Sequence, residues 1–219
     1  MAADLDSLTI AGLMLPKSFA NPDDRLMLLA AARVALRSCE SPMLLEIGTW
    51  QGGMAVLLGA AAREYSPDAR VICVDPFYVD PTCTGSSKIF IGEPYFEGWR
   101  NRVCEFGMKR IILAVVAQAP EAAILIPSVA LCAIDGEHSA EAVLLDLQTY
   151  SSRLERNGLI YLHDYYGFAG VKQGVQDFIA LYPEWHSLPW FQGCGDTAVL
   201  SRNAETLDAV ALERREGLQ

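Results

Sequence analysis

Apolar and polar residues follow two periods along the chain, and these periods predict strands that alternate with helices. Short apolar runs typical of buried strands occur at 43–47, 70–74, 110–116, 128–134 and 159–162. Apolar residues at helical spacing occur at 22–38, 54–64, 95–106, 138–154 and 171–181. Asn157-Gly158 is the expected stop of the fourth of these helices.

The C-terminal part has a different pattern. Two apolar segments, 186–191 and 197–202, are separated by a Gly-Cys-Gly-Asp turn, which predicts an antiparallel hairpin. Strands that alternate with helices indicate a mainly parallel sheet covered by helices on both faces. We therefore expect one α/β domain at 22–219, with a seven-stranded, mainly parallel sheet that ends in this hairpin, after an N-terminal extension at 1–21.

The composition is acidic and argues against two classes of partner. Asp and Glu total 27 against 17 Lys and Arg, a net charge of −10. Nucleic acids and anionic membranes are bound through basic side chains, so neither is expected. The weakly charged stretch 111–134 is interrupted by Pro120, Glu121 and Pro127, which favours two buried strands around a helical turn over a membrane span.

Cysteine usage and the N-terminus indicate the compartment. The six cysteines are scattered without a C-x-x-C pair, which favours free thiols. The acidic N-terminus lacks the charged region of a signal peptide. A cytoplasmic location is therefore expected. The segment from Leu5 to Phe19 is apolar enough to pack against a second copy in a homo-oligomer.

Chemically reactive side chains stand where the predicted strands end. Glu46-Ile47-Gly48 ends the first strand, Asp75 the second, Asp135-Gly136-Glu137-His138 the fourth and His163-Asp164 the fifth. In an open parallel sheet, ligands bind outside the carboxyl ends of the strands. These motifs are therefore expected to surround one crevice.

The turn at 46–53 and Asp75 indicate a nucleotide-like ligand. The G-x-x-x-G-G spacing from Gly48 lets a ligand approach the backbone closely, and Asp75 is placed to bind ribose hydroxyls. A plain tight turn and a solvated aspartate are the alternatives. An oxidoreductase is disfavoured because the turn lacks the G-x-G-x-x-G spacing and no Tyr-x-x-x-Lys pair occurs.

Asp135 and Asp164 are candidate metal ligands. If their strands are neighbours, the two carboxylates can share one cation. His163 is a third candidate, which suits Mn²⁺, Fe²⁺ or Zn²⁺ better than Mg²⁺; alternatively, it packs as an ordinary strand residue. Glu137 or His138 is then placed to accept a proton from a substrate, although both also suit the start of a helix.

Three blocks of sequence carry a resemblance to a known family: LLEIGTWQGG, AIDGEHSAEAVLLDL and NGLIYLHDYYGFAGVKQGVQDF. Together they resemble the class I S-adenosylmethionine-dependent methyltransferases. The likeness is greatest to the branch with the macrocin-type and mycinamicin-type O-methyltransferases and the cephalosporin hydroxylase-like proteins, and it spans roughly residues 25 to 202. It implies a Rossmann-like fold, S-adenosylmethionine as cofactor, and methylation of a hydroxyl group on a small molecule such as a sugar or natural product, assisted by Mg²⁺ or Mn²⁺.

The resemblance also implies roles for single residues. The residues expected to bind the cofactor are Glu46, Gly48, Thr49, Gly52, Gly53, Asp75, Gln118 and Asp135. Of these, Asp75 would bind the ribose, and Gln118 would contact the adenine from a loop where the family usually has Gly-Asp-Ser. The expected metal ligands are Asp135, His163 and Asp164, with His163 in place of a usual acid.

The proton acceptor implied by the resemblance is Glu137, with His138 as the alternative. The departures from the family pattern at Gln118 and His163 leave open a protein that binds S-adenosylmethionine without catalysis, as a partner or regulatory subunit. Methylation at nitrogen or carbon, which needs no metal, is a further alternative.

Overall fold

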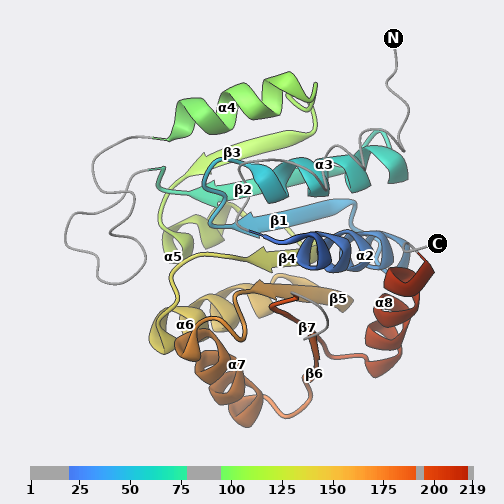
Figure 1. Ribbon diagram of the computed structural model, residues 1–219, viewed down its shortest axis with the longest axis vertical. Coiled ribbons are helices and arrows are strands. Elements are labelled where there is room, and N and C mark those ends of the chain that lie inside the picture. The colour runs from blue at the N-terminus through green and yellow to red at the C-terminus, as the bar shows by residue number, and fades with distance from the viewer. Residues whose placement is uncertain (1–19, 78–94, 191–194, 217–219) are drawn as a thin grey trace.

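Seven strands form one sheet between two layers of helices in the computed structural model, which describes residues 20–77, 95–190 and 195–216 (Figure 1). The strands are β1 (Met43–Ile47), β2 (Arg70–Asp75), β3 (Ile112–Val116), β4 (Val129–Ile134), β5 (Leu154–His163), β6 (His186–Trp190) and β7 (Thr197–Ser201). The helices are α2 (Pro22–Ser38), α3 (Gly53–Tyr65), α4 (Phe96–Glu105), α5 (Ala119–Ala122), the short 3₁₀ turn η2 (Ala123–Leu125), α6 (Ala140–Ser151), α7 (Ala169–Leu181) and α8 (Ala204–Glu216).

The strand order is β3-β2-β1-β4-β5-β7-β6. Strands β1 to β5 pair in parallel, and β7 is antiparallel to both β5 and β6. The predicted Rossmann-like α/β sheet with an antiparallel C-terminal hairpin is therefore confirmed. Because the chain order reverses at β1, between β2 and β4, the carboxyl ends of β1 and β4 border the crevice that such sheets use for ligands.

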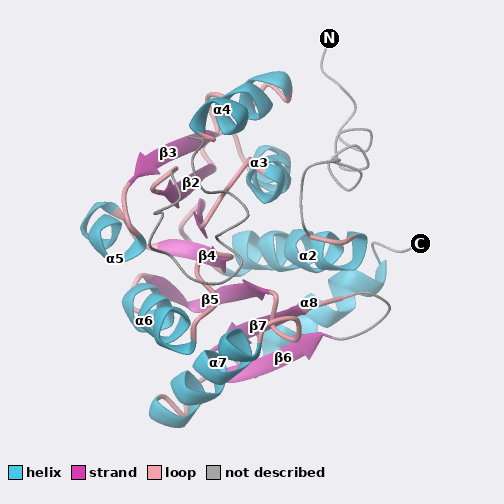
Figure 2. Cartoon of the chain, turned by 60° about the vertical axis from the view of Figure 1, so that its left-hand side comes forward, coloured by secondary structure: helices cyan, strands magenta, loops and turns pink. Residues whose placement is uncertain are grey.

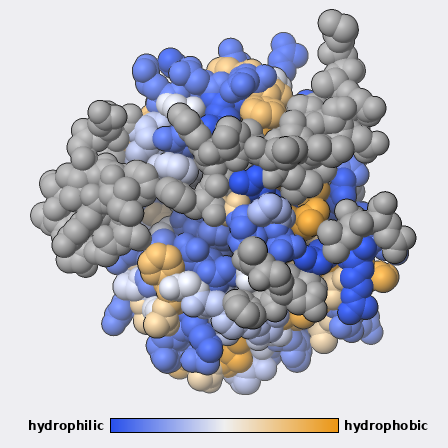
Figure 3. Space-filling model, in the orientation of Figure 1, coloured by the Kyte–Doolittle hydropathy of each residue, from blue (hydrophilic) through white to orange (hydrophobic). Residues whose placement is uncertain are grey.

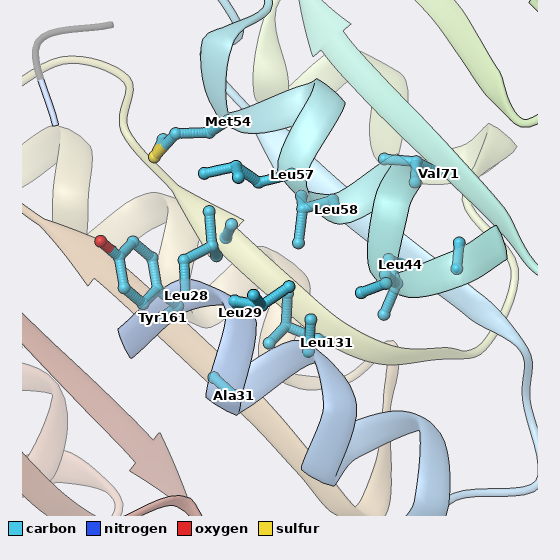
Figure 4. Close-up of a cluster of buried hydrophobic side chains, with 14 of the residues drawn as sticks. Leu28, Leu29, Ala31, Leu44, Met54, Leu57, Leu58, Val71, Leu131 and Tyr161 are labelled. Atoms are coloured by element: carbon cyan, nitrogen blue, oxygen red, sulfur yellow. The ribbon is translucent and has the colours of Figure 1, made fainter. Parts of the chain in front are cut away.

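The sheet is buried on both faces. Helices α2, α3 and α8 cover one face, and α5, α6 and α7 cover the other (Figure 2). Successive residues of β1 point to opposite sides, so Leu44 packs in the cluster with α2 and α3 while Leu45 packs in the other. Figure 4 shows Leu28 of α2 beside Tyr161 of β5, with Leu57 of α3 close by.

Helix α2 begins with a capping box. The Asn21 side chain accepts hydrogen bonds from the backbone N–H groups of Asp23 and Asp24, and the Asp24 carboxylate accepts one from the Asn21 N–H. Pro22 occupies the first turn, where its missing N–H costs nothing. The cap fixes the Asp24 side chain, which is fully buried beneath the sheet end.

Two sequence predictions need correction in the C-terminal half. Helix α6 ends at Ser151, although it was expected to run to residue 154 and to be stopped by Asn157-Gly158; residues 154–158 instead begin β5. The pair Asn157-Gly158 lies inside β5, next to a register shift against β4. A Cβ at Gly158 would lie 3.1 Å from the Ala130 carbonyl oxygen, so the glycine permits close strand contact there rather than ending a helix. Helix α8 was not predicted.

The described surface is largely hydrophilic. On the face shown in Figure 3, hydrophilic side chains cover most of the described surface and apolar ones occur in separate places. Within the described ranges, no helix has the length and apolar character needed to cross a membrane. Cys73 and Cys132 are buried free thiols, as expected.

Candidate functional site

The turn between β1 and α3 depends on two glycines. Gly48 and Gly52 both have positive φ angles, of 77° and 78°. A Cβ at Gly48 would clash with the backbone carbonyl of Asp135, and one at Gly52 would lie 2.9 Å from Trp99 Cδ1. The turn is thus pressed against the end of β4 on one side and against α4 on the other. Gly53, also expected at this site, is the first residue of α3.

Asp75 stabilises this turn from the end of β2. Its Oδ2 atom accepts hydrogen bonds from the backbone N–H groups of Thr49 (2.8 Å) and Trp50 (3.1 Å). Its Oδ1 atom accepts from the Phe77 N–H (2.6 Å) and from the Tyr95 hydroxyl (2.7 Å). A carboxylate offers about four acceptor positions, so protein donors engage each of them in this state.

An aromatic cluster closes the α4 side of the turn. Trp99 is buried, stacks on Phe96 at 5.7 Å and meets Phe77 edge-on at 5.5 Å. Its indole N–H donates to the Thr49 hydroxyl at 3.0 Å. Trp99 and Phe96 thus pack between α4 and the turn.

Glu46 lies in the interior beneath the turn. The side chain is fully buried and accepts a hydrogen bond from the Cys73 thiol, with 3.1 Å between Sγ and Oε2. Burial raises the pKa of the Glu46 carboxyl group to about 8, although hydrogen bonds from Thr49 and Cys73 act in the opposite direction. The group is therefore largely protonated at neutral pH.

The ends of β4 and β5 bring two aspartates and two histidines together, as the sequence predicted. Nδ1 of His163 lies 3.2 Å from Asp135 Oδ1 and 3.3 Å from Asp164 Oδ1. Nε2 of His138 lies 3.0 Å from Asp164 Oδ2 and 3.9 Å from Asp135 Oδ1. Asp135, His138 and Asp164 each offer a ligand atom within 4.8 Å of the other two. Asp164 has a φ of 58°, a left-handed conformation that aspartate tolerates.

Asp24 is part of this cluster, and the sequence reasoning missed it. Nε2 of His163 lies 3.4 Å from Asp24 Oδ2, and both side chains are almost fully buried. The other Asp24 oxygen accepts a 2.6 Å hydrogen bond from the Asp196 N–H. The sequence pattern predicted only a helix at 22–38 here, because the position of Asp24 under β5 depends on tertiary packing.

Charges in the cluster stabilise one another. Burial opposes the charge on Asp135 and Asp164, but the histidines outweigh it and lower the pKa of both carboxyl groups. Burial also opposes protonation of the histidines, yet the carboxylates raise the pKa of His138 to about 9 and that of His163 well above its usual range. With three carboxylates facing two imidazoles, the cluster has both oxygen and nitrogen donors for a cation.

The remaining predicted site residues lie further out. Glu137 is exposed between Asp135 and His138. Gln118 is exposed at the start of α5, two residues past Val116, which pairs with Asp75. Gln118 is thus on the β2–β3 side of the crevice. The acid–histidine cluster (Asp24, Asp135, His138, His163 and Asp164) is on the β4–β5 side.

Comparisons with known proteins identify the family of the chain. A family model described as a methyltransferase domain matches residues 45–165. No curated protein sequence matches the chain.

Several solved structures have a similar fold. The O-methyltransferase NovP is 16% identical, with 84% of this chain and 81% of that chain covered and a TM-score of 0.65. TomG from Streptomyces achromogenes, an O-methyltransferase involved in tomaymycin synthesis and solved with SAM, is 17% identical over 90% of this chain and 87% of that chain, with a TM-score of 0.61. An O-methyltransferase from Bacillus cereus in complex with SAH is 15% identical over 90% and 88%, with a TM-score of 0.61. At these identities the likeness concerns the fold.

Proposed function

Since the chain belongs to the methyltransferase-domain family, we propose that it transfers the methyl group of S-adenosylmethionine to a hydroxyl group of a small molecule. One observation carries this proposal: the glycine turn touches the acid–histidine cluster. The Asp135 N–H donates to the Ile47 carbonyl at 2.8 Å, and Gly48 contacts the Asp135 backbone. A methyl donor bound at the turn is therefore adjacent to an acceptor bound at the cluster.

The cofactor would lie across the carboxyl ends of β4, β1, β2 and β3. In this proposal, Glu46, Gly48, Thr49, Gly52 and Gly53 contact the methionine part, together with Asp135. Asp75 accepts hydrogen bonds from the ribose, and Gln118 lies beside the adenine. The names of TomG and the B. cereus enzyme, solved with SAM and SAH, support this choice of cofactor.

The cluster residues fit a divalent cation. Asp135 and Asp164 supply carboxylate oxygens, and either His163 or His138 supplies a third donor. A bound cation lowers the pKa of a coordinated hydroxyl group and orients its oxygen. This donor set supports a place in the macrocin and mycinamicin branch, with a histidine where an acid is usual.

In the reaction, the substrate oxygen attacks the methyl carbon in line with the bond to sulfur. The carbon–oxygen bond forms as the carbon–sulfur bond breaks, and S-adenosylhomocysteine is the leaving product. Glu137, next to the cluster, accepts the hydroxyl proton; His138, the alternative, can do so only after it gives up the proton that the neighbouring carboxylates hold on it. Alignment of the two reactants supplies much of the rate, up to ~7–11 kcal/mol in favourable systems.

Calorimetric titration of the full chain with S-adenosylmethionine and S-adenosylhomocysteine, with and without Mg²⁺ or Mn²⁺, tests the proposal. We expect micromolar binding of both ligands and none of NAD, the control. The Asp164→Ala variant is expected to bind the cofactor unchanged but to lose metal-dependent methylation in a screen of hydroxylated acceptors. Absence of cofactor binding would refute the proposal, whereas binding without turnover of any acceptor would favour a non-catalytic binding protein.

A further inference from the structure

Asp135, His138 and Asp164 are the less buried members of the cluster, with side chains 25%, 21% and 22% exposed. Their ligand atoms all lie within 4.8 Å of one another. Two ligands of one ion at about 2.1–2.2 Å are separated by about 3 Å when adjacent and by at most about 4.4 Å when opposite. The separations from His138 Nε2, 3.0 Å to Asp164 and 3.9 Å to Asp135, fall within these limits.

His163 is engaged on both edges of its ring. Nδ1 lies between oxygens of Asp135 and Asp164, and Nε2 faces Asp24. Its side chain is only 3% exposed, against 21% for His138. His163 therefore holds two carboxylates in place from the buried side of the cluster, while His138 lies on the less buried side.

Asp24 makes the position of His163 rigid. One oxygen of Asp24 accepts from the Asp196 N–H, and the other accepts from the Asn21 N–H and faces His163. The hydroxyl of Tyr161 donates to the Asp24 backbone carbonyl at 3.2 Å. Contacts from α2, β5 and the start of β7 therefore converge on this single buried carboxylate.

His138 is oriented by a different contact. Its ring stacks on Phe168, with ring centroids 4.1 Å apart and 15° between the planes. Stacking fixes the ring plane and leaves Nε2 directed towards the two aspartates. Once the incoming ion displaces the proton on Nε2, the imidazole can act as a ligand without a change in the backbone.

We propose that the cluster is a transition-metal site in which His138 supplies a nitrogen ligand beside Asp135 and Asp164, and in which His163, held by Asp24, is a positioning residue. Mg²⁺ prefers a shell of oxygen atoms, whereas imidazole suits Mn²⁺, Co²⁺ or Zn²⁺. Asp24 and His163 take the part of the outer-shell groups that orient metal ligands. With His138 on the metal, the proton acceptor is Glu137.

Only the catalytic role of the ion depends on the proposed function. Binding of the ion is measured without cofactor or acceptor and can be tested separately. The purified full chain is titrated with Mn²⁺, Co²⁺ and Mg²⁺ by calorimetry, and the Mn²⁺ form is examined by pulsed EPR for coupling to a bound imidazole nitrogen. The variants are His138→Gln, His163→Gln, Asp24→Asn and, as a matched control, His186→Gln, which changes an exposed histidine on the edge strand β6.

We expect Mn²⁺ to bind at least tenfold more tightly than Mg²⁺, with nitrogen coupling in the wild type and in His186→Gln. His138→Gln is expected to lose the coupling. Asp24→Asn and His163→Gln are expected to keep it while Mn²⁺ affinity falls about 10- to 100-fold, as for other outer-shell changes. If His163→Gln does not fold, Asp24→Asn provides the same test.

Three results would overturn the inference: no binding of any of the three ions, equal affinity for Mg²⁺ and Mn²⁺, or nitrogen coupling that survives His138→Gln and disappears in His163→Gln. Failure of the methyltransferase proposal gives a different result, with metal bound as described and no binding of S-adenosylmethionine.

Discussion

At the scale of single residues, Asp75 has two possible partners for one oxygen atom. In the structure, its Oδ1 accepts a hydrogen bond from the Tyr95 hydroxyl. In the proposed complex, a ribose hydroxyl uses the same carboxylate. Tyr95 therefore competes with the cofactor, and binding must displace its hydroxyl or share the oxygen with it.

The variant Tyr95→Phe tests this competition. It removes the hydroxyl while keeping the ring against Phe77, at a centroid distance of 5.9 Å. The unfolding free energy should fall by about 1 kcal/mol, and cofactor affinity should rise about fivefold, since one hydrogen bond no longer has to be exchanged. Calorimetry measures the affinity, and Tyr65→Phe, a change on the exposed end of α3, is the control. Weaker binding would instead identify the Tyr95 hydroxyl as a cofactor contact.

At the scale of elements, α2 links the core to the site. Its apolar side packs on the sheet, and its N-terminal turn places Asp24 under His163. The cap residue Asn21 thus affects both stability and the geometry of the cluster.

The variant Asn21→Ala separates these two effects when compared with Asn203→Ala. Asn203 caps the start of α8, where its side chain accepts from the Glu205 N–H at 3.0 Å. Both variants should lose about 1 kcal/mol of unfolding free energy in urea titrations. Only Asn21→Ala should also weaken Mn²⁺ binding, because it removes a constraint on Asp24. Equal metal affinity in the two variants would show that the cap does not influence the cluster.

Many of the strands, and the reactive residues that follow them, could be predicted from the sequence. Continuous apolar runs such as VICV and LCAI indicate parallel strands buried on both faces, and the reactive residues were found because they follow those runs directly. The prediction that Asn157-Gly158 ends a helix was wrong, because a glycine that permits close strand contact has the same sequence signal as one that ends a helix. The contacts of Asp24 with His163 and of Tyr95 with Asp75 could not be predicted, since only tertiary packing brings these residues together.

At the scale of the whole molecule, two carboxyl groups, those of Glu46 and Asp146, are buried in a protein whose net charge is −10. Burial raises the pKa of Glu46 to about 8, and burial together with the charge of Glu137 raises that of Asp146 to about 7. At pH values between the ordinary pKa of each carboxyl group and its raised pKa, the folded state binds more protons than the unfolded state. Stability is therefore expected to decrease as pH rises through this window.

Urea unfolding at pH 5.5 and pH 8 measures this decrease. For the wild type we expect a loss on the order of a few kcal/mol at the higher pH. Glu46→Gln, which has no proton to lose, should show a smaller decrease, whereas the exposed Glu121→Gln should behave as the wild type. The same pH dependence in Glu46→Gln and wild type would assign the effect to other groups, including the general repulsion among acidic side chains.

The hydrogen bond from Asp196 to Asp24 joins residues 172 positions apart. During synthesis, the glycine turn and both aspartates of the cluster leave the ribosome before β7 does. At that stage the nascent chain contains the residues that face the crevice but not the contact that fixes the carboxylate beneath them. A truncated product that ends after β5 would therefore carry the family motifs but lack the backbone N–H that fixes Asp24, so the cluster takes its final form only when β7 has joined the sheet.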